Sequence, residues 1–339
     1  MSEIERRKRD HIDIVLAGGA RHSVPAGFDH VRFRHDALPE VDYDKINLST
    51  SFLGRPLRLP FLASSMTGGP DVSDRINRAI AEAAEQMGFA MGVGSQRISL
   101  TTRDNSGLGP ELRRIAPSIP IYGNLGAIQL VNGMGIDEAR RAVDQLQADA
   151  LILHLNPVQE AVQPGGDRNW SGVQRAIEQL TGKLPVPVIA KEVGSGISGE
   201  VARRLVSCGV AAIDVAGAGG TSWAAVEGAR LGAPDGGNLG EIFRDWGIPT
   251  PQCLAEVRAA LPDVPLIASG GIRHGLDAAK AIRLGANLAA QAASLLPAAM
   301  QGTEAVVAHV QAFADALRIT CLATGSKDLA TLRGADLLP

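Results

Sequence analysis

The feature that most constrains the fold is a strand-and-helix unit that recurs eight times beyond residue 56. Each unit starts with a short aliphatic run ending in Gly, Ser, Asn or Thr and continues with apolar residues at helical spacing. The strands are predicted at 57–65, 89–94, 119–124, 150–156, 186–192, 211–216, 266–269 and 288–292, with helices at 72–88, 136–148, 198–208 and 275–284 among them. Buried strands alternating with helices in about 280 residues favour an α/β fold, a closed (β/α)8 TIM barrel.

Two segments stand outside this repeat. Residues 1–56 begin with a helix-like stretch and are expected to form an arm packed on a barrel of residues 57–339. Residues 217–249, after the sixth strand, are rich in glycine and too long for an ordinary connection. A loop of this length is typical of lids or partly disordered segments.

Charge and cysteine content exclude several classes of protein. The chain has 33 Lys and Arg against 36 Asp and Glu, a net charge of −3, which predicts no binding to nucleic acid or to anionic membranes. Its 3 cysteines are widely spaced, so they form no disulfide framework or zinc knuckle and favour a reducing compartment, the cytoplasm. We also identify no signal peptide and no apolar stretch long enough to span a membrane.

The active site of such a barrel lies where the strands end. Gly270 and Gly271 follow the seventh strand, and Ala292 and Ala293 follow the eighth. In these positions barrels bind a phosphate group through backbone N–H groups. A Cβ atom would keep those N–H groups away from the phosphate oxygens. Alternatively, the glycines relieve crowding at a tight turn.

Lys191 ends an apolar strand, so its ammonium group must face the barrel mouth or be buried with a partner. A bound anion would satisfy it, and in flavin barrels such a lysine faces the edge of the ring where negative charge collects on reduction. The alternative is an ion pair with Glu192 or another barrel carboxylate.

A basic run at 6–11 has two interpretations. It is an ordinary solvated helix face, or, if the arm folds over the barrel mouth, Arg7, Lys8 and His11 converge with Arg97 on a second phosphate group. In the loop after the fourth strand, Glu160 is a candidate ligand for a Mg²⁺ ion shared with substrate phosphates. His154 in the same loop is either a core residue or part of the site, and no histidine cluster indicates zinc.

A series of motifs then carries a resemblance to a known family. In order along the chain they are Arg-Lys-x-x-His (7–11), Met-Thr-Gly-Gly (66–69), Gly-Ser-Gln-Arg (94–97), Asn-Leu-Gly-Ala (124–127), His-x-Asn-x-x-Gln-Glu (154–160), Gly-Asp-Arg (166–168), Lys-Glu-x-Gly (191–194), Ala-Gly-x-Gly-Gly-Thr (216–221) and Ser-Gly-Gly-Ile-Arg (269–273). Across nearly its whole length the chain resembles the type 2, FMN-dependent isopentenyl-diphosphate delta-isomerases. It departs from them in its alanine-rich eighth strand and after Gly-Asp-Arg.

The resemblance implies an enzyme that interconverts isopentenyl and dimethylallyl diphosphate with reduced FMN and Mg²⁺, with NADPH as reductant, and that forms a homo-oligomer. By matching positions, FMN would contact Ser65, Met66, Thr67, Ser95, Asn124, Lys191, Thr221, Gly270, Gly271, Ala292 and Ala293. The substrate would contact Arg7, Lys8, His11, Ser95, Gln96, Arg97 and Gln159. Glu160 would bind Mg²⁺, and Gln159, Lys191 and His154 would act in catalysis.

Two other functions fit parts of the sequence. An FMN-dependent 2-hydroxy-acid oxidoreductase would share Gly270 and Gly271 but should need a histidine base after the sixth strand, and residues 214–221 contain no histidine. A catalytically silent sensor of flavin or prenyl diphosphate would be expected to lose its polar strand-end residues, which are present here.

Overall fold

The computed structural model describes residues 3–65, 72–101, 108–231 and 238–339. Eight parallel strands form a closed barrel in the order β10-β3-β4-β5-β6-β7-β8-β9. These strands are β3 (Phe61–Ala63), β4 (Ala90–Gly92), β5 (Ile121–Gly126), β6 (Ala150–Leu155), β7 (Val188–Glu192), β8 (Ala212–Asp214), β9 (Leu266–Ala268) and β10 (Leu288–Gln291). Seven of them lie within the predicted runs, and β5 extends beyond the run predicted at 119–124, so the predicted barrel is confirmed.

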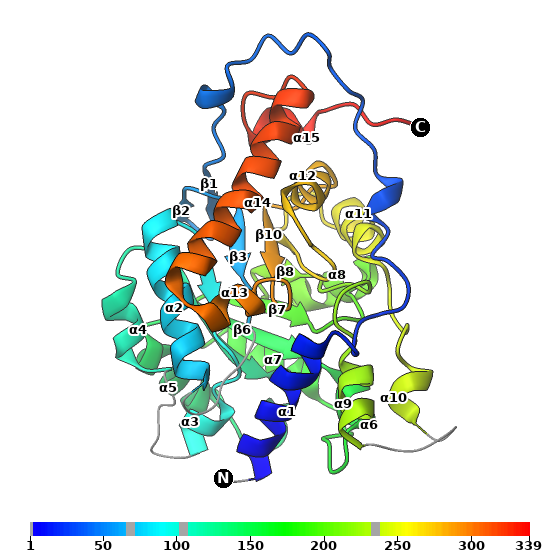
Figure 1. Ribbon diagram of the computed structural model, residues 1–339. Coiled ribbons are helices and arrows are strands. Elements are labelled where there is room, and N and C mark those ends of the chain that lie inside the picture. Colours follow the sequence, from blue (N-terminus) through cyan, green and yellow to red (C-terminus); the bar gives the residue numbers. More distant parts are fainter. Residues whose placement is uncertain (1–2, 66–71, 102–107, 232–237) are drawn as a thin grey trace.

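Helices surround the barrel, as Figure 1 shows. They are α1 (Glu3–Ala17), α2 (Val72–Met87), α3 (Arg97–Thr101), α4 (Pro110–Ile115), α5 (Ile136–Leu146), α6 (Pro157–Val162), α7 (Val173–Thr181), α8 (Gly199–Ser207), α9 (Trp223–Leu231), α10 (Leu239–Ile242), α11 (Thr250–Ala260), α12 (Gly275–Arg283), α13 (Leu296–Gln301), α14 (Thr303–Ala323) and α15 (Leu329–Arg333). Short 3-10 helices lie at Phe28–His30, Tyr43–Lys45 and Ala127–Leu130.

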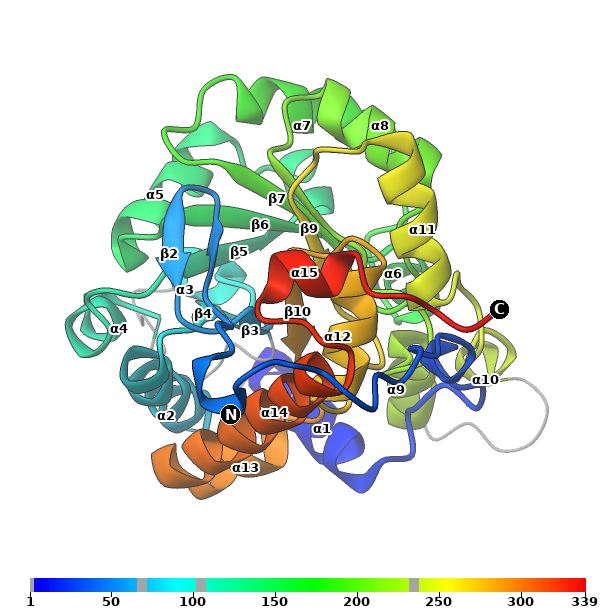
Figure 2. The same ribbon diagram turned by 90° about the horizontal axis from the view of Figure 1, so that it is seen from above.

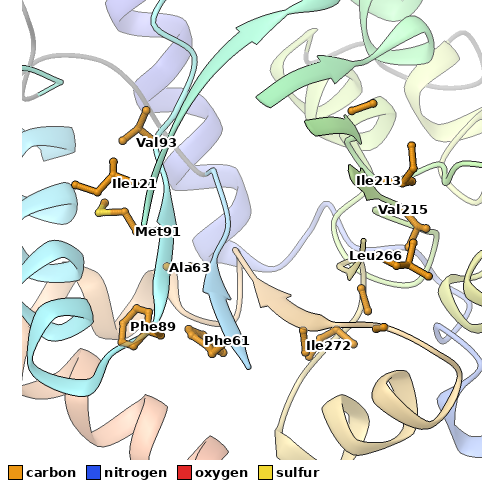
Figure 3. Packing of buried hydrophobic residues seen from close by; sticks show 14 of the residues in the cluster. Phe61, Ala63, Phe89, Met91, Val93, Ile121, Ile213, Val215, Leu266 and Ile272 are labelled. Atoms are coloured by element: carbon orange, nitrogen blue, oxygen red, sulfur yellow. The ribbon is translucent and has the colours of Figure 1, made fainter. Parts of the chain in front are cut away.

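The barrel strands bury both faces. Their outward side chains pack against the surrounding helices in one large cluster, part of which Figure 3 shows from Phe61 and Phe89 on one side to Ile213 and Leu266 on the other. Their inward side chains, including Leu62, form a second cluster that fills the barrel interior near the amino ends of the strands. The continuous apolar runs of the sequence follow from this two-sided burial.

An antiparallel hairpin precedes the barrel. It consists of β1 (Thr50–Phe52) and β2 (Arg55–Leu57), and its Phe52 and Leu57 pack with the inward residues of the barrel. Phe52 lies against Tyr122 of β5, with ring centroids 6.4 Å apart. Figure 2 shows β2 lying in front of the barrel strands at this end. The hairpin therefore covers the end at which the strands begin, and position 57, predicted to start the first barrel strand, instead ends β2.

The N-terminal segment runs along the outside of the barrel from α1 to this hairpin (Figure 1). Lys280 of α12 donates a hydrogen bond of 2.9 Å from Nζ to the carbonyl of Phe28. Backbone N–H groups of Arg34, Asp36 and Asn47 donate to carbonyls in the C-terminal segment, between 323 and 336. The two ends of the chain are therefore fastened to each other.

One prediction about local structure needs correction. The glycine-rich connection after β8 is not a structureless lid in its described part, because it contains α9 and α10. The apolar run at 223–231 is long enough to form α9, whose Ala224, Ala225 and Val226 are buried.

The 21-residue helix α14 was not singled out from the sequence, although it is long and apolar enough to cross a membrane by length and composition alone. In the structure Val306, Val310, Phe313, Leu317 and Cys321 of this helix are buried, and it packs on α2, α12 and α13 of the barrel. Its apolar side chains therefore belong to the layer around the barrel.

Candidate functional site

A cavity of about 420 Å³ lies at the carboxyl ends of the barrel strands and is called the strand-end cavity below. The inward positions change character along each strand, for example from Ile189 to Lys191 on β7 and from Tyr122 to Asn124 on β5. Because inward side chains alternate along a strand, the apolar positions fill the barrel and the polar ones reach its mouth.

Most of the sequence-predicted residues meet in this cavity. Those that line it are Arg7, Lys8, His11, Ser65, Ser95, Arg97, Asn124, His154, Gln159, Glu160, Lys191, Thr221, Gly270, Gly271, Ala292 and Ala293. Met66 and Thr67 lie outside the described residues.

Gln96 is the predicted residue that the structure does not bring to the cavity. Its side chain is fully buried behind the strand ends, where Nε2 donates to the carbonyl of Ala142 at 2.9 Å and Oε1 accepts from the Asn124 N–H at 3.0 Å. Both polar groups of the amide are therefore used in holding α5 and β5 together. The neighbours of Gln96, Ser95 and Arg97, do line the cavity.

Lys191 presents a buried positive charge at the cavity. Its Nζ donates to the backbone carbonyl of Glu192 at 2.7 Å and lies 3.9 Å from Oδ2 of Asp214. Asp214 is fully buried and also accepts from Oγ of Ser269 at 2.5 Å, while its Oδ2 has no hydrogen-bond partner among the described residues. Burial raises the pKa of the Asp214 carboxyl, and the nearby Lys191 opposes that shift.

The alternative pairing of Lys191 with the Glu192 carboxylate does not occur. That carboxylate accepts from the backbone N–H groups of Val193 and Gly194 at 2.6 Å and of Gly196 at 3.1 Å, and also from that of Ser195. Asp214 is thus the only carboxylate within 4 Å of the lysine in the described chain, and it leaves donor capacity on Nζ for a bound anion.

His154 is held in one tautomer. Nδ2 of Asn124 donates to the carbonyl of Val93 at 3.2 Å, so Oδ1 of Asn124 is left to accept from Nδ1 of His154 at 2.7 Å. Burial and the nearby Lys191 lower the pKa of His154 to about 4. At neutral pH the ring is therefore uncharged, with its proton on Nδ1 and an acceptor lone pair on Nε2.

Glu160 and its neighbours form an oxygen-rich wall. The Glu160 carboxylate, 8% exposed, accepts from Nδ2 of Asn156 at 3.0 Å and from the backbone N–H of Asp167 at 2.7 Å. Oδ1 of Asn156 is buried and has no partner among the described residues. No group of three metal-ligating side chains occurs in the described ranges. Glu160 therefore suits a Mg²⁺ ion that takes its other oxygen ligands from water and a bound phosphate.

Helix α1 supplies cations to the part of the cavity wall next to α6 and α9. The Lys8 ammonium nitrogen is buried and has no hydrogen-bond partner in the described chain. Burial, with a smaller contribution from neighbouring Arg7, lowers the pKa of Lys8 to about 8. A buried, unpartnered ammonium group next to a guanidinium is costly unless an anion binds there.

Glu227 of α9 holds this wall in place, and sequence analysis did not identify it. Its buried carboxylate accepts from Nε2 of His11 at 3.0 Å, from Nε2 of Gln159 at 2.9 Å and from Arg230 at 2.5 Å. These hydrogen bonds lower the pKa of Glu227 to about 2 despite its burial. In Figure 1, α1, α6 and α9 lie together at the mouth of the barrel.

The glycine loop after β9 supports the interpretation that its glycines relieve crowding, and it also lies at the cavity. Gly270 and Gly271 adopt φ values of 93° and 74°, and a Cβ atom on Gly270 would overlap the carbonyl of Gly217. The glycines therefore do relieve crowding between two strand-end loops, and they also line the cavity with backbone.

Polar side chains from the alanine-rich eighth strand brace this loop. The carbonyl of Ile272 accepts from Nε2 of Gln291 and from Oγ of Ser294, both at 3.2 Å. His309 of α14 lies 2.7 Å from Oε1 of Gln291 through its Nε2. The eighth strand thus fixes the Gly270–Gly271 loop through its side chains, in a segment that the motifs left undefined.

FMN fits these groups on three observations. Oγ of Ser65 is buried without a partner among the described residues, Lys191 offers a cation at the barrel mouth, and the Gly270–Gly271 loop offers backbone that no Cβ atom covers. An anionic flavin ring and its phosphate could occupy these positions together.

Comparison with known proteins decides the family. The family model described as FMN-dependent dehydrogenase matches residues 18–103 and 138–338. The isopentenyl-diphosphate delta-isomerase of Xanthobacter autotrophicus is 60% identical over 333 residues, 98% of this chain and 97% of its own length. The protein of the same name from Vibrio parahaemolyticus is 55% identical over 339 residues, 100% of both chains. The chain belongs to the isopentenyl-diphosphate delta-isomerase family.

Several solved structures of other proteins have a fold similar to that of this chain. A mandelate oxidase variant with a monooxide FMN adduct has a TM-score of 0.69 at 20% identity, covering 99% of each chain. The lactate oxidase of Pediococcus acidilactici has a TM-score of 0.66 at 18% identity, covering 99% of this chain and 94% of its own. At such low identity the likeness concerns the barrel alone.

Proposed function

We propose that the chain interconverts isopentenyl diphosphate and dimethylallyl diphosphate by shifting a carbon–carbon double bond. The observation that carries this proposal is that two candidate anion sites line one cavity: the backbone of the glycine loop at Gly270–Gly271 and the buried Lys8 beside Arg7, whose Nζ has no partner among the described residues. One suits the phosphate of FMN and the other the diphosphate of the substrate. Membership of the isomerase family, with relatives at 60% and 55% identity over almost the whole chain, supports the same activity.

The cofactor would be held by side chains and backbone around the strand ends. We assign FMN to Ser65, Met66, Thr67, Ser95, Asn124, Lys191, Thr221, Gly270, Gly271, Ala292 and Ala293. We assign the substrate to Arg7, Lys8, His11, Ser95, Arg97 and Gln159, with Gln96 acting behind the site because its amide is used in the fold.

The lining residues explain why a flavin is needed. Moving the double bond requires one proton to be added to a carbon and another to be removed from an allylic carbon. Among the described residues that line the cavity, Glu160 is the one carboxylate and no cysteine is present. Reduced FMN, when bound, supplies the acid/base group that these side chains lack.

The chain's own residues hold and polarise the reactants. Lys191 presents a positive charge at the barrel mouth that would stabilise negative charge on a bound flavin, and Asp214 lies 3.9 Å from its Nζ. Neutral His154 is fixed by Asn124 and offers Nε2 as a hydrogen-bond acceptor without adding charge. Glu227 orients the Gln159 amide, whose place in the cavity suits the hydrocarbon end of the substrate.

Glu160 would bind Mg²⁺ together with the substrate diphosphate. We expect Glu160→Gln to abolish the Mg²⁺ requirement and most activity while FMN stays bound, because the carboxylate serves the diphosphate and not the flavin. Mg²⁺ dependence of turnover and FMN fluorescence titration measure the two effects. An unchanged dependence on Mg²⁺ would remove Glu160 from the site.

The decisive experiment measures the use of reductant. Under anaerobic conditions NADPH or dithionite should be needed to start turnover, yet consumption should stop near about one equivalent per active site because substrate and product have the same oxidation level. Consumption in step with product would mean a redox reaction and would overturn the isomerase assignment, whereas reduction of the bound flavin by a 2-hydroxy acid would favour the oxidoreductase alternative. A colourless protein that binds no flavin would refute both.

We further propose that the protein is a cytoplasmic homo-oligomer.

A further inference from the structure

A second hollow, of about 390 Å³, lies between the ends of α11, α12 and α15. Three arginines line it, Arg258, Arg283 and Arg333, with small and aliphatic residues between them. The hollow lies at the carboxyl ends of these barrel helices, whereas the strand-end cavity lies at the carboxyl ends of the strands. Because helices and strands run in opposite directions in such a barrel, the two sites are on opposite sides of the molecule. Figures 1 and 2 both show α11, α12 and α15 grouped together.

The three arginines have no carboxylate partner within ion-pair distance in the described chain. Arg258 donates to the carbonyls of Leu261 at 3.3 Å and Gly285 at 2.6 Å, so it serves partly as a brace between α11 and the end of α12. Arg283 donates from Nε to the carbonyl of Ala335 at 2.5 Å, which leaves its two terminal nitrogens free of recorded bonds.

Arg333 is the decisive residue. It is half-buried, and its guanidinium group makes no hydrogen bond or ion pair within residues 3–65, 72–101, 108–231 and 238–339. Burial lowers the pKa of Arg333, and burial together with neighbouring Arg333 lowers that of Arg258, against a smaller opposing effect of Asp263. A half-buried guanidinium with unused donors favours an external acceptor.

The helix ends do not neutralise this charge. Each carboxyl end of a full helix carries roughly half a negative charge, so α11 and α12 together offset about one of the three positive charges. The five-residue α15 adds little. About two positive charges are left in a protein whose net charge is −3. Helix capping therefore accounts for Arg258 but not for the free donors of Arg283 and Arg333.

We propose that this arginine hollow, defined by Arg258, Arg283 and Arg333, binds a doubly charged phosphate-type anion. Guanidinium groups bind phosphate oxygens through paired N–H donors, and Arg283 and Arg333 retain such donors. Inorganic phosphate, diphosphate and the phosphate end of a small metabolite share this chemistry. The proposal concerns a site outside the strand-end cavity and does not rest on the proposed isomerase activity.

The test removes one anion site and then the other. In the FMN-loaded double variant Arg7→Ala and Lys8→Ala, calorimetric titration with inorganic diphosphate in the absence of Mg²⁺ should still show one binding event per chain. Adding Arg283→Gln and Arg333→Gln should weaken that event at least tenfold. As a control, Arg175→Gln and Arg203→Gln are added to the Arg7 and Lys8 double variant instead. They remove the same charge from exposed positions on α7 and α8 and should leave the binding event unchanged.

Several results would overturn the proposal. They are the absence of the event in the first variant, its persistence after the Arg283 and Arg333 substitutions, or an equal loss in the Arg175 and Arg203 control. If the Gln pair does not fold, Arg283→Lys with Arg333→Lys keeps the charge and should retain binding with reduced affinity, and unaltered affinity there would count against bidentate recognition. With Arg7 and Lys8 intact, the Gln pair should keep wild-type turnover, so failure of this site and failure of the proposed function are distinguishable.

Discussion

Replacing Glu227 with glutamine tests whether one buried carboxylate holds α1 over the barrel mouth. The carboxylate accepts hydrogen bonds from His11, Gln159 and Arg230, and these partners lower its pKa from 4.5 to about 2. A shift of that size corresponds to about 3 kcal/mol of preference for the charged form in the folded protein. Glu227→Gln keeps the shape of the side chain but removes this charge.

Loss of the Glu227 charge should weaken substrate binding and leave flavin binding unchanged. His11 is the residue through which Glu227 holds α1, and α1 carries Arg7 and Lys8. If most of the 3 kcal/mol is lost from α1 docking, KM should rise by roughly 10- to 100-fold. The FMN dissociation constant, set at the strand ends, should change little. Steady-state kinetics and flavin fluorescence measure the two quantities, and hydrogen exchange of residues 6–17 reports directly on α1.

Glu111→Gln is the matched control, because it makes the same change on α4 at an exposed ion pair with Arg114. Exposed pairs contribute about 0–1 kcal/mol, so this variant should behave like the parent. If Glu227→Gln left both KM and the exchange of α1 unchanged, the carboxylate would not hold the helix. Acid should not mimic the substitution near neutrality: the stabilisation is complete above pH 4.5 and is lost only as the pH falls towards about 2.

Three further predictions concern the same cavity. Burial and Arg7 lower the pKa of Lys8 to about 8, so affinity for diphosphate in a pH titration should fall as the pH rises through about 8, and Lys8→Arg should remove that fall. Gln291→Ala deletes one hydrogen bond to the glycine loop, so fluorescence titration should show roughly fivefold to tenfold weaker FMN binding with little change in KM. Lys191→Met should weaken FMN binding by about tenfold or more and depress turnover at saturating FMN; equal affinity in both proteins would place Lys191 away from the flavin.

The barrel could be predicted because each of its strands and helices has a recognisable local sequence pattern. Each apolar run and each helical period is readable within about ten residues, and eight repeats leave few other topologies. The helices α9 and α10 were hidden in a glycine-rich connection, where tertiary packing of Ala225 and Val226 outweighs the weak local signal.

The site was predictable where a strand end alone placed a residue, as for Lys191. Glu227 had no such signal: its partners His11 and Gln159 are 216 and 68 positions away, so only the fold brings them together. Gln96 shows the opposite error, because a residue at a strand end can turn towards α5 as easily as towards the cavity. Sequence places the backbone at the rim but leaves the direction of each side chain open.

The fastening of the chain's two ends affects how the protein can fold during synthesis. β3 is made early, but its partner β10, with Ala289 opposite Phe61, is among the last strands to leave the ribosome. The segment containing Arg34 likewise waits for Asp336. At roughly 5–20 residues per second, the stretch from Ala63 to Gln291 takes about 11–46 seconds to make, and the edge of β3 has no partner during that time. Barrel closure therefore waits for β10, and docking of the N-terminal segment waits for the residues around Asp336, so a chain cut before β10 would expose both the open edge of β3 and the undocked segment.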